Sequence, residues 1–260
     1  MATKTLQTRH GPMIAFCGDK YITPPLESGE YAPDELALLA QLVRPGMTVV
    51  GVGANIGAHT VPLAKACAPG LLYASEPQQR VFQVMCANLV LNEVANVVAR
   101  PEACGETEGE ATIPRLDYDA VENFGGVSLQ PTDRGGERVR VVALDQLALA
   151  RCDLIKIDAE GFEPQVLKGA DQTIARCRPI IYAENDRPAQ QQEVISMLDA
   201  MGYSLHWRTP LLAEPAVFGG VAYASINMLC LPKERDIAVK GEPAIDPANW
   251  ASPVPVSGAA

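Results

Sequence analysis

The sequence has no excess of basic residues, although such an excess is typical of proteins that bind nucleic acid. It contains 21 Lys and Arg against 31 Asp and Glu, which gives a formal net charge of -10. Affinity for nucleic acid comes largely from Lys and Arg that displace counterions from phosphates. DNA and RNA are therefore disfavoured as partners.

The sequence also lacks the usual signs of a metal-binding ribbon, a membrane span and a secretion signal. Its seven cysteines include no C-x-x-C pair, which argues against a zinc ribbon and a thioredoxin-type motif and indicates reduced thiols. No run approaches the roughly 18 apolar residues of a membrane-spanning helix, and residues 1–10 are too polar for a signal peptide. A cytoplasmic protein with no membrane partner is predicted.

Short β-branched runs alternate along the chain with longer stretches of helical period. Such alternation is typical of an α/β sheet whose parallel strands are joined by helices. We expect strands at residues 47–52, 71–75, 96–99, 138–144, 154–158, 180–184, 203–208 and 223–231. We expect helices at residues 35–42, 57–67, 81–89, 163–177 and 189–201.

Three segments fall outside this alternation. Residues 1–33 are expected to form a leader or cap before the domain at 34–232. Residues 101–137 are rich in glycine, proline and acids, and are expected to form an irregular, hairpin-like insertion. Residues 233–260 are rich in alanine, proline and acids without an apolar period, which predicts disorder.

Three glycines follow the first predicted strand in a G-x-G-x-x-x-G turn, at Gly51, Gly53 and Gly57. Glycines let a ligand approach the backbone, and the start of the next helix offers free N–H groups. About twenty residues further on, at the end of the second strand, Glu76 can accept hydrogen bonds from two ribose hydroxyls. The spacing predicts a nucleoside pocket, with a ligand-free strand-to-helix turn as the alternative.

Residue types in this turn help to distinguish two nucleoside cofactors. Dinucleotide-binding folds place a third glycine three residues after the second, where a pyrophosphate is seated, but Ile56 stands there. No tyrosine has a lysine four residues on, so the Tyr-x-x-x-Lys pair of short-chain dehydrogenases is absent. S-adenosylmethionine carries no phosphate and suits a looser turn with a polar Asn55. It is favoured as the cofactor, and an NAD-dependent oxidoreductase remains the alternative.

Acidic residues follow two neighbouring predicted strands. Asp158 and Glu160 follow one strand in the run K-I-D-A-E-G, and Glu184 opens the run E-N-D-R after the next. Open α/β sheets bind ligands at the carboxyl ends of their strands, so these three carboxylates are predicted to face one crevice and take a proton from a hydroxyl. Two structural alternatives remain, a helix cap by Asp158 and an ion pair between the next acid, Asp186, and Arg187.

The same strand ends could bind a divalent metal ion. Asp158, Glu184 and Asn185 offer oxygen ligands of the kind that Mg²⁺ takes. None of these residues has the dense acid spacing of a dedicated cation loop. Proton transfer without a metal is therefore favoured over a metal site.

Two histidines lie on predicted elements near this crevice. His59 falls one turn into the helix after the glycine turn, and His206 lies beside Trp207 in a late strand. An imidazole suits a general base, and an indole can stack on an acceptor ring. For His59, His206 and Trp207 alike, the alternative is a role in packing.

Four blocks of residues resemble the FkbM family of methyltransferases. The third, K-I-D-x-E-G-x-E with L-K-G-A behind it, is highly specific. The blocks are Val52-Gly53-Ala54-Asn55-Ile56-Gly57, Ser75-Glu76-Pro77, Lys156 to Glu163 with Leu167-Lys168-Gly169-Ala170, and Ser225-Ile226-Asn227-Met228-Leu229-Cys230.

This resemblance covers residues 26–232 and implies a Rossmann-like class I methyltransferase fold. Such a fold has a mostly parallel seven-stranded sheet with helices on both faces, here with a small β insertion. The resemblance also implies S-adenosylmethionine as cofactor and methyl transfer to a hydroxyl of a sugar or secondary metabolite. A small-molecule hydroxyl acceptor is then the expected partner, and a homodimer is compatible with the sequence.

Individual site residues follow from these patterns and from the resemblance. The acceptor side is expected to contain Asn123, Asn185, His206 and Trp207. The catalytic carboxylates are expected to be Asp158, Glu160 and Glu184. The expected cofactor contacts are Gly51, Gly53, Ala54, Asn55, Gly57, Glu76, Pro77, Ala103 and Asp158.

The sequence departs from the family pattern in two places. The family usually has an acid at the position of Gly51, where it helps to hold the methionine amino group of the cofactor. Arg208 stands where a late block usually has histidine. These departures keep open a further alternative, a non-catalytic ligand-binding protein that retains the cofactor fold.

Overall fold

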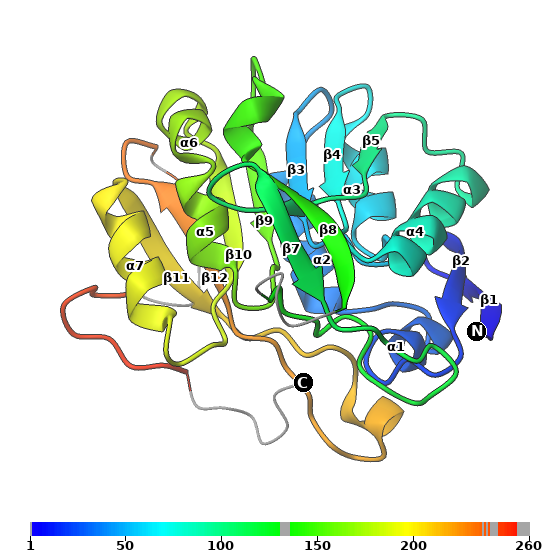
Figure 1. The fold of residues 1–260 in the computed structure, drawn as a ribbon. Coiled ribbons are helices and arrows are strands. Elements are labelled where there is room, and N and C mark those ends of the chain that lie inside the picture. The colour runs from blue at the N-terminus through cyan, green and yellow to red at the C-terminus, as the bar shows by residue number, and fades with distance from the viewer. Residues whose placement is uncertain (1, 131–135, 236, 238, 240–243, 254–260) are drawn as a thin grey trace.

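In the computed structural model, a seven-stranded sheet lies between two layers of helices (Figure 1). The structure describes residues 2–130, 136–235, 237, 239 and 244–253. The strands of the main sheet are β3 (Val49–Val52), β4 (Leu72–Ser75), β5 (Val97–Arg100), β9 (Leu154–Ile157), β10 (Ile180–Glu184), β11 (Tyr203–Arg208) and β12 (Asn227–Pro232). Across the sheet their order is β11-β12-β10-β9-β3-β4-β5.

Only β12 runs against its neighbours in this sheet, and the other pairs are parallel. The predicted mostly parallel seven-stranded sheet is confirmed. The order of the strands reverses between β3 and β9, because the chain passes from β3 to β4 on one side and continues from β9 to β10 on the other. Open α/β sheets bind ligands at such a switch point, beyond the carboxyl ends of the strands.

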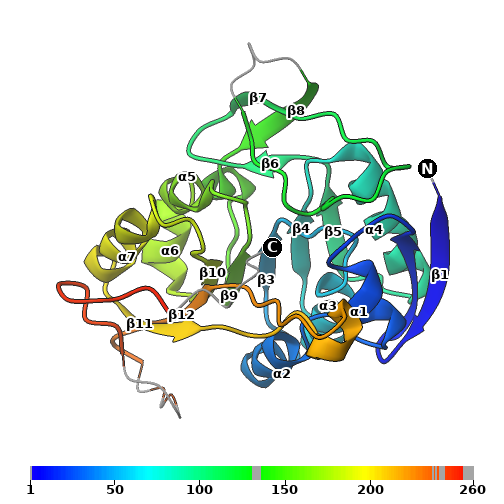
Figure 2. The same ribbon diagram turned by 90° about the horizontal axis from the view of Figure 1, so that it is seen from below.

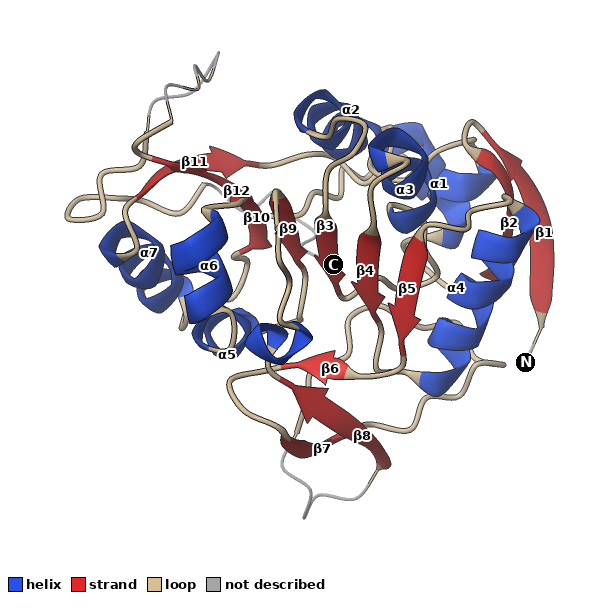
Figure 3. Ribbon diagram, turned by 90° about the horizontal axis from the view of Figure 1, so that it is seen from above, coloured by secondary structure: helices blue, strands red, loops and turns tan. Residues whose placement is uncertain are grey.

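Alternate residues of the central strands face opposite helix layers. On one face, Val50 and Ile155 pack with α5 (Glu163–Lys168), α6 (Asp171–Cys177) and α7 (Gln191–Ala200). On the other face, Val49 and Leu154 pack with α2 (Pro33–Leu42), α3 (Thr60–Cys67) and α4 (Gln79–Leu91). Figure 3 shows these two groups of helices on opposite sides of the sheet.

Two segments outside the sheet cover its ligand-binding end. The N-terminal hairpin of β1 (Thr3–Thr8) and β2 (Gly11–Phe16) lies beside α4 and leads to the short helix α1 (Thr23–Glu27). Phe16 packs edge-on against Phe124 of the insertion, with ring centroids 5.5 Å apart. Backbone hydrogen bonds from Lys20 to Glu122 and from Glu122 to Gly18 join the two segments. The leader and the insertion therefore form one cover.

The insertion also forms a small sheet with the strand that follows it, visible apart from the main sheet in Figure 2. Its strands are β6 (Ala103–Cys104), β7 (Gly109–Ile113) and β8 (Glu137–Val142), in the order β6-β8-β7. The strand predicted at 138–144 is therefore β8, which pairs with the two strands of the insertion and not with the main sheet. Short 3₁₀ helices follow it at Leu144–Leu147 and, later, at Pro215–Phe218.

The single helix predicted at 163–177 is two helices, α5 and α6, joined at Gly169 and Ala170. A Cβ on Gly169 would lie 1.9 Å from the carbonyl oxygen of Gly105. The close approach of this backbone requires glycine, and the helix ends there. Among the described residues, no helix is both long and apolar enough to cross a membrane.

Residues 244–253 contact the folded domain, although disorder was predicted for residues 233–260. The N–H of Ile245 donates to the Leu205 carbonyl at 2.7 Å, and the Trp250 indole donates to Gln192 at 2.7 Å. Both apolar side chains pack against the core on the α7 face of the sheet. The rest of the predicted tail beyond residue 235 lies largely outside the described residues.

Candidate active site

A pocket lies at the carboxyl ends of β3, β4, β9 and β10, at the switch point of the sheet. A smaller pocket adjoins it and shares Gly53, Glu76, Gly125, Asp158 and Glu160 with it, so the two form one crevice. The main part is lined by four of the five residues of the glycine turn that were predicted to contact the cofactor. These are Gly51, Gly53, Ala54 and Asn55. The smaller part adds Pro77 and Ala103.

The glycine turn fits tightly against the neighbouring strand end. Gly53 has φ +74°, and a Cβ there would lie 1.8 Å from the carbonyl oxygen of Asp158. The N–H groups of Gly53 and Ala54 both donate to the Ser75 carbonyl, at 3.1 and 2.9 Å. The turn thus brings three strand ends together, and only glycine fits at position 53.

The carboxylate of Glu76 is held in place by the backbone. The N–H of Asn55 donates to its Oε2 at 3.0 Å, and the N–H of Gln78 donates to its Oε1 at 2.9 Å. The residue is 3% exposed, and burial raises the pKa of Glu76 to about 7 although both N–H groups oppose the shift. Each carboxylate oxygen can accept a further hydrogen bond, so Glu76 can bind a pair of hydroxyls in the pocket.

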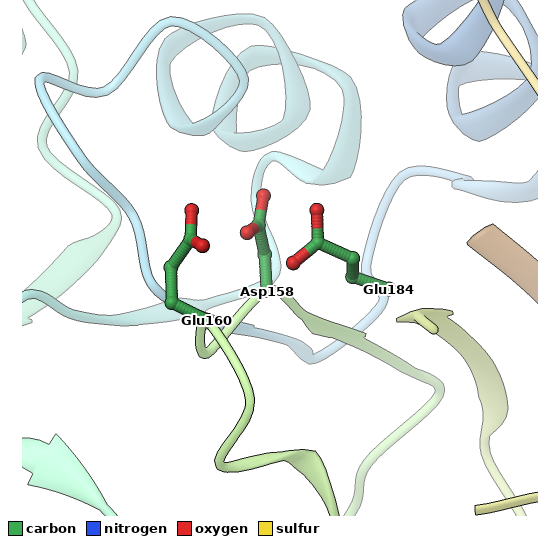
Figure 4. A group of neighbouring side chains, drawn as sticks. All are labelled: Asp158, Glu160 and Glu184. Carbon is green, nitrogen blue, oxygen red and sulfur yellow. The ribbon is translucent and has the colours of Figure 1, made fainter. Parts of the chain in front are cut away.

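Three carboxylates come together on the opposite side of the crevice. Asp158 and Glu160 follow β9, Glu184 ends β10, and one oxygen of each lies within 4.8 Å of the others. Figure 4 shows the Asp158 carboxylate between the other two. Glu184 is 8% exposed, and its Oε2 has no hydrogen-bond partner among the described residues. The predicted convergence of these three side chains is present in the structure.

Two cations flank this cluster. Lys156 donates to Asp158 at 2.8 Å, while Arg187 pairs with Glu160 and also lies 3.3 Å from Asp186. An ion pair between Asp186 and Arg187 was the structural alternative to a site at the second strand end. The structure contains both this ion pair and the pocket. Asp158 does not cap α5, because the N-cap position of this helix is Phe162 and no side chain forms a capping hydrogen bond there. Glu163 accepts the N–H groups of Ala159 and Gly161 in the loop before the helix.

Crowding and burial change the protonation of these acids. Burial, with Asp158 and Glu160 nearby, raises the pKa of Glu184 well above its usual range. Burial and the Asp158 charge raise the pKa of Glu160 to about 8, although Arg187 opposes the shift. A carboxylate with a raised pKa is a stronger base once it is ionised. An ionised carboxylate of this cluster is therefore suited to act as a general base.

A family model of the methyltransferase FkbM domain matches residues 51–205. This chain belongs to the FkbM methyltransferase family. The matched residues run from the glycine turn to β11 and include the Glu76 carboxylate and all three clustered acids.

The individual relatives of this FkbM methyltransferase share only a modest part of its sequence. It is 28% identical to methyltransferase sdnD of Sordaria araneosa over 193 residues, which cover 60% of this chain and 73% of that protein. The crystal structure of methyltransferase FkbM from Methylobacillus flagellatus KT is similar in fold, with a TM-score of 0.50 and 16% identity. The match covers 75% of this chain and half of the length of that longer chain.

Three residues predicted on the acceptor side lie elsewhere in this FkbM methyltransferase. Asn185 is buried, and its amide donates toward the Gln191 carbonyl and the Met228 sulfur rather than lining the pocket. His206 and Trp207 are on β11, the edge strand, with β12 and β10 between them and the switch point. The Trp207 ring lies 6.0 Å from that of Trp250. These three predictions are corrected, because none of the three residues lines the pocket.

Asn123 does line the pocket, as predicted. Its side-chain oxygen accepts the N–H groups of Gly125 and Gly126, at 3.0 and 2.9 Å. The amide thus shapes the loop that covers the crevice. Gly57, the one predicted turn residue outside the lining, has φ +87° and packs against Met85.

Sequence reasoning missed Glu35, which lies in the pocket with Tyr31. From the sequence, Glu35 was predicted only to be part of a helix at 35–42, without a role in a site. A signal was present, since Glu35 stands one and two turns before Leu39 and Leu42 on the apolar face of that helix. A charged residue on a buried face needs a partner. The partner of Glu35 is Lys156, which also lines the pocket.

Proposed function

We propose that this protein binds S-adenosylmethionine and transfers its methyl group to a hydroxyl of a small molecule, such as a sugar or a secondary metabolite. One observation supports this most directly. The crevice places the backbone-held Glu76 carboxylate and a cluster of three acids, of which Glu184 is buried, around the same glycine turn. When bound, the cofactor supplies a methyl group on a positively charged sulfur.

The residues present fit the nucleoside part of this cofactor. Glu76 would accept hydrogen bonds from both ribose hydroxyls, with its two oxygens already oriented by Asn55 and Gln78. The smaller part of the crevice, lined by Pro77 and Ala103, would hold the base. The glycine turn at Gly53 would let the cofactor lie against the backbone.

The acid cluster would act on the acceptor. Methyl transfer to oxygen requires that the acceptor be aligned with the methyl group and that one proton be removed. Glu184 lines this crevice, its buried Oε2 has no hydrogen-bond partner among the described residues, and its pKa is raised, so it would take the proton. Asp158 is held by Lys156 and Glu160 by Arg187, so both would orient the acceptor.

Calorimetry with S-adenosylhomocysteine and with NAD separates this proposal from an oxidoreductase. We expect S-adenosylhomocysteine to bind and NAD not to bind. Glu76→Ala should weaken S-adenosylhomocysteine binding at least about tenfold, because one or two hydrogen bonds to a charged group are lost, each worth roughly 1.5–3 kcal/mol. Unchanged binding in a folded variant would contradict the role of Glu76.

Catalysis is tested with labelled S-adenosylmethionine and a panel of hydroxylated sugars and metabolites. Transfer of the label to an acceptor oxygen supports the proposal. Cofactor binding without transfer to any hydroxyl, or transfer to nitrogen or carbon acceptors instead, would contradict the assigned reaction. Mass spectrometry of the product distinguishes these outcomes.

A further inference from the structure

We infer that Glu35 and Lys156 together bind the amino-acid end of the cofactor, with Glu35 taking the ammonium group and Lys156 the carboxylate. This inference rests on the proposed function. It concerns a polar chamber beyond the glycine turn, formed by Glu35, Lys156, His59 and Tyr31.

Glu35 is a buried carboxylate that is incompletely paired. It is 4% exposed, and no described residue forms a hydrogen bond with its Oε1. The nearest cation, Nζ of Lys156, lies 3.5 Å away, and Nδ1 of His59 lies 3.6 Å away. Burying a charge without hydrogen bonds is costly, so a buried oxygen in this state is suited to a cationic donor from a ligand.

His59 contributes no competing positive charge. Burial lowers the pKa of His59 to about 3, so its imidazole is neutral at physiological pH. Its Nε2 is also buried and forms no hydrogen bond within the described part of the chain. An ammonium group next to Glu35 would therefore meet a neutral ring. Among the described residues that line the pocket, Lys156 is the one cation.

The missing side chain at Gly51 leaves room in this part of the pocket. Gly51 pairs with Lys156 across the parallel strands β3 and β9, and paired residues point to the same face of a sheet. Among the described residues, a Cβ on Gly51 would have only the Tyr73 carbonyl oxygen within 4 Å, at 3.9 Å. One pocket thus extends from Glu76 past the glycine turn to Glu35.

The charges match those of an amino acid. Glu35 and Lys156 are opposite charges 3.5 Å apart, and an amino acid presents an ammonium and a carboxylate on the same carbon. Lys156 also donates to Asp158 at 2.8 Å, which fixes its ammonium at the side of the pocket nearest the acid cluster. A ligand whose ribose binds Glu76 would then place its amino-acid end in this chamber.

The test compares S-adenosylhomocysteine with 5′-methylthioadenosine, which has the same nucleoside but no amino-acid end. By calorimetry, Glu35→Gln should weaken S-adenosylhomocysteine at least about tenfold and change methylthioadenosine less than about twofold. Asp34→Asn, which removes an exposed acid from the same helix, is the matched control and should change neither affinity. Equal losses for both ligands, or no loss for either, would overturn the inference.

A second measurement does not depend on folding of the variant. Wild-type protein should bind S-adenosylhomocysteine at least about tenfold more tightly than the analogue that lacks its α-amino group. Equal affinities would overturn the role of Glu35. Failure of the proposed function looks different, since wild-type protein would then bind neither S-adenosylhomocysteine nor methylthioadenosine.

Discussion

The N–H of Asn55 donates a hydrogen bond of 3.0 Å to Oε2 of Glu76. Asn55 has φ +49°, a left-handed conformation in which its N–H points at the end of the neighbouring strand β4. The glycine turn and the ribose-binding candidate are therefore one structural unit. Because the carboxylate is also buried, its protonation should control binding of the nucleoside.

Binding of 5′-methylthioadenosine should depend on pH through Glu76. Burial raises the pKa of Glu76 to about 7 in the free protein, and hydroxyl donors favour the ionised form. The affinity should therefore be nearly full at about pH 8 and fall as the pH drops through 7, by about tenfold between pH 8 and pH 6. Calorimetry in buffers of different ionisation enthalpy should show proton release on binding near pH 6.

Glu76→Gln provides the control for this pH effect. The variant cannot ionise at this position, so its weaker binding should be the same at pH 6 and pH 8. Wild-type binding that does not change over this range would contradict the assigned ionisation. The ligand has no amino-acid end, so no amine of its own contributes to the result.

Gly51→Asp should restore part of the cofactor affinity lost in Glu35→Gln. Gly51 has an ordinary backbone conformation and open space beside it, and its position pairs with Lys156. A carboxylate there would face the same chamber and offer the ammonium a replacement acid. We expect the double variant to bind S-adenosylhomocysteine at least about threefold more tightly than Glu35→Gln, as measured by calorimetry.

Gly51→Ala in the same background is the matched control, because it fills the space without adding charge. It should restore nothing. Equal recovery with alanine and aspartate would show that packing, rather than charge, limits binding in Glu35→Gln.

Proton removal by the acid cluster should give a rising pH profile. Burial and the neighbouring Asp158 and Glu160 hold the pKa of Glu184 well above its usual range. Only the ionised form accepts a proton, so kcat/KM should rise with pH through an ionisation above the ordinary carboxyl range and be lost as the pH falls. Glu184→Gln should lower kcat by about 10²-fold or more and remove this ionisation.

A chelator separates proton transfer from metal-assisted catalysis in the same cluster. The oxygens of Asp158, Glu160 and Glu184 lie close enough to hold a cation, but Lys156 and Arg187 already pair with two of them. We therefore expect EDTA to leave turnover unchanged. Loss of turnover with EDTA and recovery with Mg²⁺ would contradict this and make Glu184 a metal ligand.

Gly53→Ala should destabilise the fold more than an ordinary glycine substitution. Its left-handed backbone costs a side chain about 1–2 kcal/mol, and the added Cβ would overlap the Asp158 carbonyl at 1.8 Å. We expect a loss of at least about 2 kcal/mol in denaturant unfolding. Gly109→Ala is the control, because no described residue lies within 4 Å of the added carbon. Similar losses in both variants would contradict the argument.

The sequence by itself determined the alternation of strands and helices and the local site signals. The β-branched runs and the glycine turn at Gly53 are short-range features, because strand period and turn geometry depend on neighbouring residues. The carboxylates of Glu76, Asp158 and Glu184 could be placed at strand ends for the same reason. Their convergence followed from the rule that parallel strands end at one edge of the sheet.

Only the tertiary structure decided which distant residues share the pocket. Glu35 lies more than one hundred residues before Lys156 in the sequence, and their pairing depends on how α2 packs across β9. His206 and Trp207 looked suited to a site, but the strand order puts β11 at the edge of the sheet, away from the switch point. Strand order and helix packing depend on contacts between segments far apart in the chain, which local patterns do not encode.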